Sequence, residues 1–168
     1  PEAERNWQVL LTAIQGILEQ FEGKKLIFLA AIAPSLALPS LIESLKAYHW
    51  ESVENSQLSE DQDSYQGLLF QQHQSQLWLT QSAYAACLRQ GHVAIAMAGT
   101  ATEQFVGLGK PALIIPGEGP QFTLAFAQKQ TRLLGSAIIL APHPQDVAML
   151  LKGLIADPDR WRRMGEVG

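Results

Sequence analysis

One pattern in the middle of the chain constrains the fold more than any other feature. An apolar run over 93–97 ends in a small turn at Gly99, a short helical pattern covers 101–108, and a second apolar run covers 111–115. A strand, a tight turn, a helix and a second strand in this order form a unit whose two strands are parallel. The first helical N–H groups of such a unit lack intrahelical acceptors, so an anion can bind there.

The rest of the sequence alternates between strand-like and helix-like segments in the same way. Strands are predicted over 26–33, 67–70, 76–80 and 137–140, and helices over 1–22, 40–50, 82–91 and 122–134, from 144 onward, and again from 157. Such alternation is typical of a parallel sheet with helices on both faces. We therefore predict an α/β fold. It would be a three-layer α/β/α sandwich with a mostly parallel, Rossmann-like sheet, built by a single domain over 1–168.

Composition narrows the class of protein. Hydrophobic residues make up 47% of the 168 residues and charged residues only 17%, which favours a folded chain over a disordered one. The net charge of −4, with scattered basic residues, argues against nonspecific nucleic-acid binding. Cys87 has no second cysteine to pair with, and we interpret it as a small buried residue. No apolar run approaches the roughly 18 residues of a membrane span, so we expect a cytoplasmic protein.

The predicted sheet indicates where a ligand would bind. In open parallel sheets, ligands bind outside the carboxyl ends of the strands, and the loops over 30–39, 98–102 and 116–123 would meet there. At the second loop, main-chain N–H groups would bind a diphosphate, helped by the hydroxyl of Thr100 or Thr102. The alternative is that one of these threonines only caps the helix.

The loop over 116–123 holds two Gly and two Pro residues, which favours a fixed loop shape. Glu118 and Gln121 can each hydrogen-bond the hydroxyl groups of a ligand, although a solvated turn is the alternative. The segment Gly107-Leu108-Gly109-Lys110 is rich in glycine, but it follows a helix and precedes a strand, the reverse of a phosphate-binding loop. We interpret Gly109 as a helix C-cap. The four histidines show no ligand spacing, so no metal site is expected.

A family resemblance adds to these inferences. The segment Met97–Pro111 resembles the donor-binding segment of the GT-B glycosyltransferases, which are two-domain enzymes that use nucleotide-sugars. It looks most like lipid-A-disaccharide synthase and a related group of cyanobacterial and plant-type proteins. The segment Pro120–Thr123, with the helix after it, is similar to the next part of that family, and Arg162–Gly165 resembles its C-terminal helix.

The resemblance implies that this chain is the C-terminal, donor-binding half of such an enzyme. The first four residues of the turn and helix, from Gly99 through Thr100 and Ala101 to Thr102, would then bind the diphosphate. Gln104 occupies the position where the family has a glutamate that binds the ribose hydroxyls. A neutral amide can still bind a diol, but it forgoes the stronger charge-assisted hydrogen bond.

The other ligand contacts also follow from the resemblance. Gln121 and Thr123, together with Glu118, would lie near the sugar. The backbone around Thr80, Gln81 and Ser82 would bind the edge of the uracil base. The implied donor is a UDP-sugar, with no separate cofactor and no metal.

The family's C-terminal half opens with a strand and a Gly-Ser-Arg turn that this sequence lacks, as it lacks the N-terminal domain with the acceptor site. We therefore expect a fragment of a larger protein, missing its first strand and inactive as a transferase alone. The missing domain is an expected partner, and a lipid acceptor at a membrane surface and a homodimer stay open. Two other functions stay open as well: a nucleotide-sugar 2-epimerase, and a non-catalytic binding or regulatory module.

Overall fold

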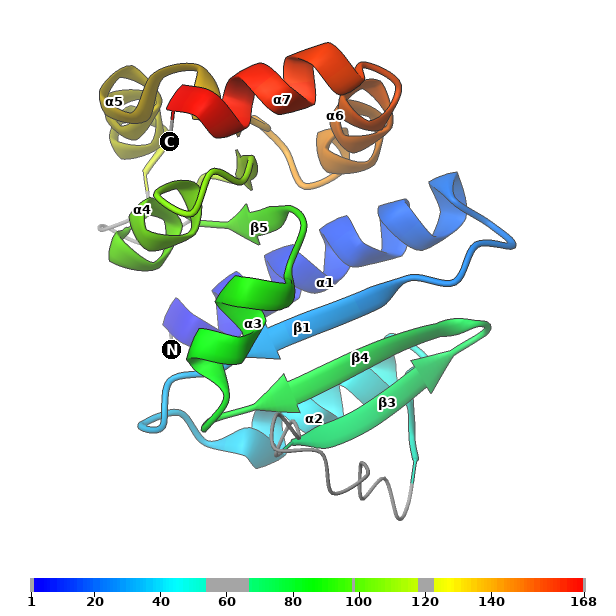
Figure 1. Cartoon of the computed structure of the whole chain (residues 1–168). Helices are drawn as coiled ribbons and strands as arrows, with labels where there is room; N and C mark the ends of the chain where they lie inside the picture. The colour runs from blue at the N-terminus through cyan, green and yellow to red at the C-terminus, as the bar shows by residue number, and fades with distance from the viewer. Residues whose placement is uncertain (1, 54–66, 98, 118–122, 168) are drawn as a thin grey trace. The chain divides into compact units, whose positions relative to one another are not determined.

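The structure is a computed structural model that describes residues 2–53, 67–97, 99–117 and 123–167. Within these residues the chain is an α/β protein with seven α-helices and two small sheets. Its contacts divide it into two compact units, one formed by 1–20 with 92–168 and the other by 21–91. We describe each unit by itself (Figure 1).

The unit over 21–91 contains a mixed four-stranded sheet with the order β1-β4-β3-β2. The strands are β1 (Ile27–Ala31), β2 (Glu51–Ser52), β3 (Leu68–Gln72) and β4 (Ser75–Thr80). β1 runs parallel to β4, as predicted, while β3 is antiparallel to both β4 and β2. The predicted α/β class is confirmed, but the strands form two sheets and one of them is mixed.

The antiparallel pairing of β3 and β4 is the part that the sequence did not predict. Gln72 pairs with Ser75, so the connection is a two-residue turn at His73 and Gln74. His73 has a φ of 52°, in the left-handed region that two-residue hairpin turns usually fill with Gly or Asn. The Gln71 Nε2 atom donates to the His73 carbonyl oxygen at 3.0 Å. The turn therefore lacks the usual hairpin residues.

Two helices accompany this sheet, α2 (Leu38–Ala47) and α3 (Tyr84–Gln90). Figure 1 shows α3 in front of β1 and α2 behind the sheet, and α3 contacts β1. Beyond α2, the buried Trp50 ring meets Phe28 of β1 edge to face, with ring centroids 6.0 Å apart. α2 begins two residues before the predicted start at residue 40, and the Ser40 hydroxyl donates to the Ala37 carbonyl.

The second unit contains a parallel three-stranded sheet with the order β5-β6-β7. Its strands are β5 (Ala94–Ala96), β6 (Ala112–Ile114) and β7 (Ile138–Leu140). Helices α4 (Thr100–Val106) and α5 (Leu124–Leu134) connect them, with the short helix η1 (Gly135–Ala137) before β7. The core of this unit joins both helices to the sheet through Val106, Ala112, Ile114, Ala127, Ala137 and Ile138. The predicted strand–helix–strand order is thus confirmed here.

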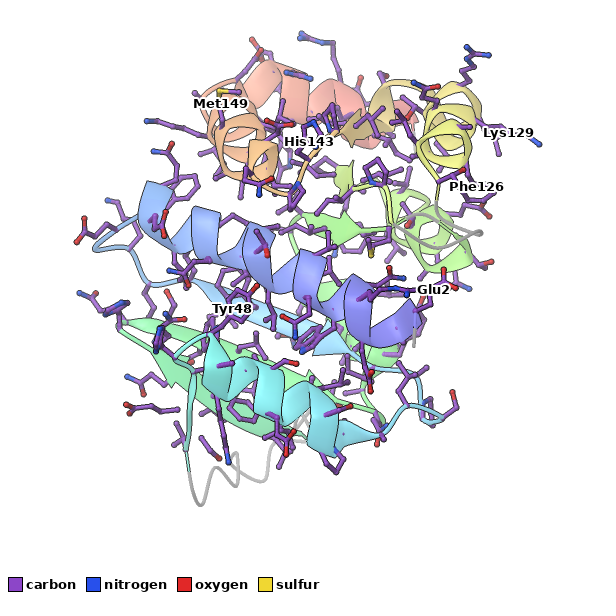
Figure 2. The ribbon with its side chains drawn as sticks, turned by 180° about the vertical axis from the view of Figure 1, so that it is seen from behind. Glu2, Tyr48, Phe126, Lys129, His143 and Met149 are labelled. Carbon is purple, nitrogen blue, oxygen red and sulfur yellow. The ribbon has the colours of Figure 1, made fainter. Side chains whose placement is uncertain are left out.

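Three further helices complete this unit, α1 (Glu2–Gln20), α6 (Asp146–Ile155) and α7 (Pro158–Val167). α1 packs on α6, where Gly16 faces the Ala148 side chain, and α6 contacts α7. Figure 2 labels Met149 on α6 and Phe126 and Lys129 on α5, all three of which are exposed. The predicted boundaries of these helices hold to within a few residues.

Candidate functional site

The turn between β5 and α4 is built on an unusual glycine. Gly99 is the N-cap of α4 and has φ 105° and ψ −177°, a conformation that is open essentially to glycine alone. The turn leaves the carboxyl end of β5, which is paired with β6. At this end of the two strands, the Ile115 N–H group donates to the Ala96 carbonyl at 2.9 Å. The sequence therefore places a glycine where the backbone needs one.

The backbone hydrogen bonds of this turn leave two donors open. The Gly99 carbonyl accepts from the N–H groups of Thr102 at 2.9 Å and Glu103 at 3.2 Å, which starts the helix. Within the described residues, the N–H groups of Thr100 and Ala101 donate to no protein acceptor. Both belong to exposed residues. The first turn of α4 thus offers two adjacent amides to solvent or to a ligand.

The side chains of α4 divide into two faces. Thr100, Ala101 and Gln104 are exposed, so the predicted diphosphate and ribose residues share the solvent side of the helix. Thr102 lies on the opposite side with only 1% of its surface exposed. Its Oγ1 atom is buried and, among the described residues, has no hydrogen-bond partner. A buried hydroxyl without a partner calls for an explanation, such as a bound water or ligand.

Charged side chains contribute little attraction at this turn. The segment 93–109 contains no Lys or Arg, and Glu103 in the first turn of α4 is acidic. Lys110 lies beyond the other end of the helix, where its Nζ atom is 5.4 Å from the centre of the Phe105 ring. Any anion bound at this turn would therefore be held by the backbone amides, as the sequence indicated.

The predicted sugar-binding residues follow β6. Glu118 and Gln121 lie outside the described residues. Thr123 is the N-cap of α5, and its Oγ1 atom accepts a hydrogen bond from the Phe126 N–H group at 3.3 Å. Because β5 and β6 are parallel neighbours, the chain leaves both strands at the same edge of the sheet. The Thr123 side chain therefore has a structural role as a cap in that region.

The predicted base-binding residues lie in the other unit, in the turn from β4 to α3. Thr80 is 2% exposed, and its Oγ1 atom accepts from the N–H groups of Ser82 at 3.3 Å and Ala83 at 3.2 Å. The N-cap of α3 is Ala83, which makes no side-chain cap bond. Thr80 supplies the oxygen because it lies at the end of β4, with its hydroxyl next to these amides.

Gln81 in the same turn fixes a neighbouring loop. Its Nε2 atom is within hydrogen-bond distance of three carbonyl oxygens after β1, those of Ala33 at 3.2 Å, Pro34 at 3.5 Å and Leu36 at 2.9 Å. The side chain therefore holds the 33–36 loop against the end of β4. The Gln81 amide group, like the Thr80 hydroxyl, is therefore already bonded to protein atoms.

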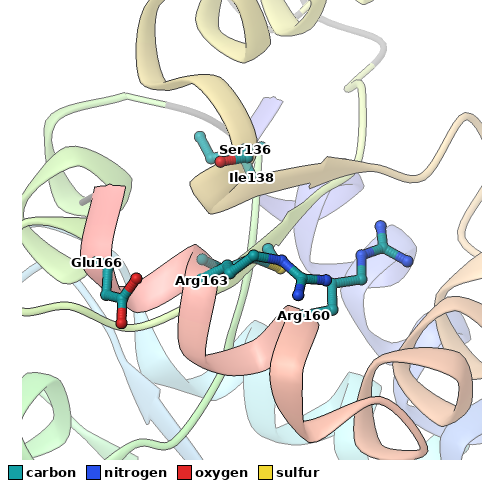
Figure 3. Close-up of a pocket in the computed structure, with 6 residues that line it drawn as sticks. Ser136, Ile138, Arg160, Arg163 and Glu166 are labelled. Carbon is teal, nitrogen blue, oxygen red and sulfur yellow. The ribbon is translucent and has the colours of Figure 1, made fainter.

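The structure also brings together residues that the sequence did not connect. Ser136 and Ile138, near the start of β7, line a groove with Arg160, Arg163, Met164 and Glu166 of α7 (Figure 3). Only Arg163 and Met164 had been singled out from the sequence, through the family resemblance. The groove could also have been suspected from the three-residue spacing of Arg160, Arg163 and Glu166, which places them along one side of a helix.

No helix in the described part of the chain is long and apolar enough to cross a membrane. The described ranges also hold no group of three or more His, Cys, Asp or Glu side chains that could bind a metal ion. Comparison of the chain with protein-family models, with curated proteins and with solved structures gives no match.

Proposed function

We propose that the turn between β5 and α4 binds the diphosphate of a nucleotide-sugar, with a UDP-sugar as donor. One observation carries this proposal: the adjacent N–H groups of Thr100 and Ala101 have no protein acceptor within the described residues. Gly99 turns the chain so that these amides start a helix at the carboxyl end of a parallel strand. Diphosphates commonly bind at such strand–glycine–helix junctions.

The exposed face of α4 further supports the proposal. Gln104 lies four residues after Thr100 on α4, so both side chains share a face of the helix and one ligand can reach them. Because α4 has only seven residues, we assign the attraction to individual amides and not to the helix dipole.

In this proposal the chain is the donor half of a GT-B glycosyltransferase with a Rossmann-like sheet, as the sequence resemblance implies. Amides directed at the diphosphate would stabilise the negative charge that grows on it when the sugar leaves. The acceptor site and the catalytic base would come from a partner domain. We therefore expect this chain alone to bind the donor without transferring the sugar.

The test is a calorimetric titration of the chain with UDP. We expect saturable binding that is lost in Gly99→Val, because valine cannot adopt the Gly99 backbone conformation without strain. Gly23→Val is the matched control: Gly23 also has a positive φ, of 75°, and no neighbouring atom within 4 Å of an added Cβ. Equal loss of binding in both variants would contradict a specific site at Gly99.

A second pair of variants isolates the amide. Thr100 is the first residue of α4, a position where proline fits well, so Thr100→Pro removes one N–H donor and preserves the helix start. We expect Thr100→Pro to weaken UDP binding about tenfold, the effect of one charge-assisted hydrogen bond. Thr100→Ala keeps the N–H group and should bind nearly as well. Absence of UDP binding by the unmodified chain would overturn the proposal and favour an interaction module.

A further inference from the structure

A groove lies along α7, within the unit formed by 1–20 and 92–168. Its volume is about 560 Å³. One wall is α7, and the other is formed by Ser136 of η1 and Ile138 at the start of β7 (Figure 3). Met164 and Ile138, which are 2% and 5% exposed, give the groove an apolar floor. Polar side chains therefore surround a small apolar surface.

The α7 wall is held in place by a close contact between backbones. A Cβ atom added to Gly165 would lie 2.5 Å from the Gly109 carbonyl oxygen, so no larger residue fits at this point. Gly109 itself has a φ of 72°. α7 also contacts η1. Both walls of the groove are thus fixed by packing within the same unit.

Only some of the arginine side chains on α7 have a carboxylate partner in the described residues. Arg162 forms an ion pair with Asp159 at 3.2 Å, and the Asp157 carboxylate accepts from the backbone N–H group of Arg160 at 2.9 Å. In the described part of the chain, the guanidinium groups of Arg160 and Arg163 have no carboxylate partner. These two arginines line the groove, whereas Arg162 does not. Two unneutralised cations therefore border it.

We propose that this groove binds the phosphate group of a small organic phosphate monoester. A guanidinium fork suits the oxygens of a phosphate, and two such groups favour a dianion over a monocarboxylate. The exposed Ser136 hydroxyl, on the opposite wall, can donate a further hydrogen bond to a phosphate oxygen. The carbon part of the ester would lie on Ile138 and Met164. None of these residues belongs to the turn at Gly99, so this site is independent of the proposed function.

Glu166 sets the position of the phosphate within the groove. It follows Arg163 by three residues on α7, and Figure 3 shows it at the opposite end of the row from Arg160. No ion pair within the described residues neutralises its carboxylate. Because like charges repel, the phosphate would lie nearer Arg160 and Arg163 than Glu166. Neutralising Glu166 should therefore strengthen binding.

The experiment is a titration of the full chain with phenyl phosphate, followed by the backbone amide signals in nuclear magnetic resonance spectra. We expect saturable shifts at residues of α7 and η1. Arg163→Gln should weaken binding about threefold, as for an exposed ion pair, and Arg160→Gln with Arg163→Gln about tenfold. Glu166→Gln should tighten binding about twofold.

Arg162→Gln is the matched control, because it removes the same charge from the same helix outside the groove. Binding in this variant should stay within about twofold of the unmodified chain. An equal loss of affinity in Arg162→Gln and Arg163→Gln would show that only the net charge of the helix matters, and it would overturn the proposal. Benzoate binding as tightly as phenyl phosphate, or shifts that do not saturate, would also overturn it. Loss of UDP binding in Gly99→Val bears only on the other site.

Discussion

Two turns of this chain join a parallel strand to a helix, and they differ in whether a side chain accepts hydrogen bonds from the backbone N–H groups of the turn. After β4, the Thr80 hydroxyl accepts from the N–H groups of Ser82 and Ala83, so a side chain closes the turn. After β5, Gly99 has no side chain to offer, and in the described residues the N–H groups of Thr100 and Ala101 meet no protein acceptor. A turn whose N–H groups are bonded to its own side chain has few donors for a ligand, whereas a turn without such a cap keeps its N–H groups available.

This difference separates two sites that the sequence treated alike. Both turns were predicted to bind parts of one nucleotide, yet they belong to different compact units and differ in free donors. In the β4–α3 turn, Thr80 caps the helix and Gln81 holds the 33–36 loop. The β5–α4 turn is therefore the better candidate, and substitutions at the two turns should have different effects.

The largest expected effect is at Gly99. Gly99→Ala should lower the free energy of unfolding by about 1–3 kcal/mol, because alanine is strained at φ 105° and ψ −177°. Urea unfolding followed by circular dichroism measures this change. Gly153→Ala is the control: Gly153 lies inside α6 with open space around it, so the same substitution should stabilise the chain by about 0.5–1 kcal/mol. Equal stability of Gly99→Ala and the unmodified chain would contradict the strained turn.

The next effect is at Thr80. Thr80→Val keeps the shape of the side chain but removes the acceptor for two amides, so it should cost about 1–2 kcal/mol of unfolding free energy. Thr80→Ser keeps the oxygen and should recover part of this loss. Urea unfolding of the three proteins compares them directly. A valine variant as stable as the serine variant would show that the hydroxyl does not close the turn.

Local signals explain why most elements could be predicted. Apolar runs mark β1 and β6, and the three-to-four-residue spacing of Trp7, Leu11 and Ile14 marks α1, because burial of a helix face or strand leaves a pattern within a few residues. The hairpin of β3 and β4 lacked such a signal, since His73 holds the left-handed position where Gly or Asn is usual. Its antiparallel direction could be learned only from the paired strands.

The site was less predictable than the fold, for a physical reason. The need for a glycine at position 99 is local, so the turn could be found from the sequence. Whether a threonine oxygen meets a nearby amide depends on its position in three dimensions, and this distinguishes Thr80 from Thr102. The groove that holds Ser136 and Arg163 depends on packing between distant segments.

At Thr102, the substitution by valine should leave the free energy of unfolding nearly unchanged or raise it slightly. Its Oγ1 atom is buried and has no partner in the described residues, so Thr102→Val exchanges an unsatisfied hydroxyl for a methyl group. Stability should stay within about 0.5 kcal/mol of the unmodified chain or rise, because a polar group without a hydrogen bond is costly to bury. The same substitution would thus be harmful at Thr80 and harmless at Thr102. A loss of more than about 1 kcal/mol in urea unfolding would show that the Thr102 hydroxyl has a protein partner.

The smallest effect concerns Cys87 in α3, the helix that follows the Thr80 turn. Burial raises the pKa of the Cys87 thiol above its ordinary value of 9.0, and a hydrogen bond from its own backbone opposes this only in part. The folded chain therefore keeps this proton at a pH where the unfolded chain releases it. The stabilisation that the buried thiol contributes is fully present below about pH 9 and is lost as the pH rises above that value. Urea unfolding of the unmodified chain and of Cys87→Ala across this range measures it, with the alanine variant as the baseline that lacks the thiol. A difference in unfolding free energy that stays constant or grows above about pH 9 would contradict a thiol shielded from water in the folded helix.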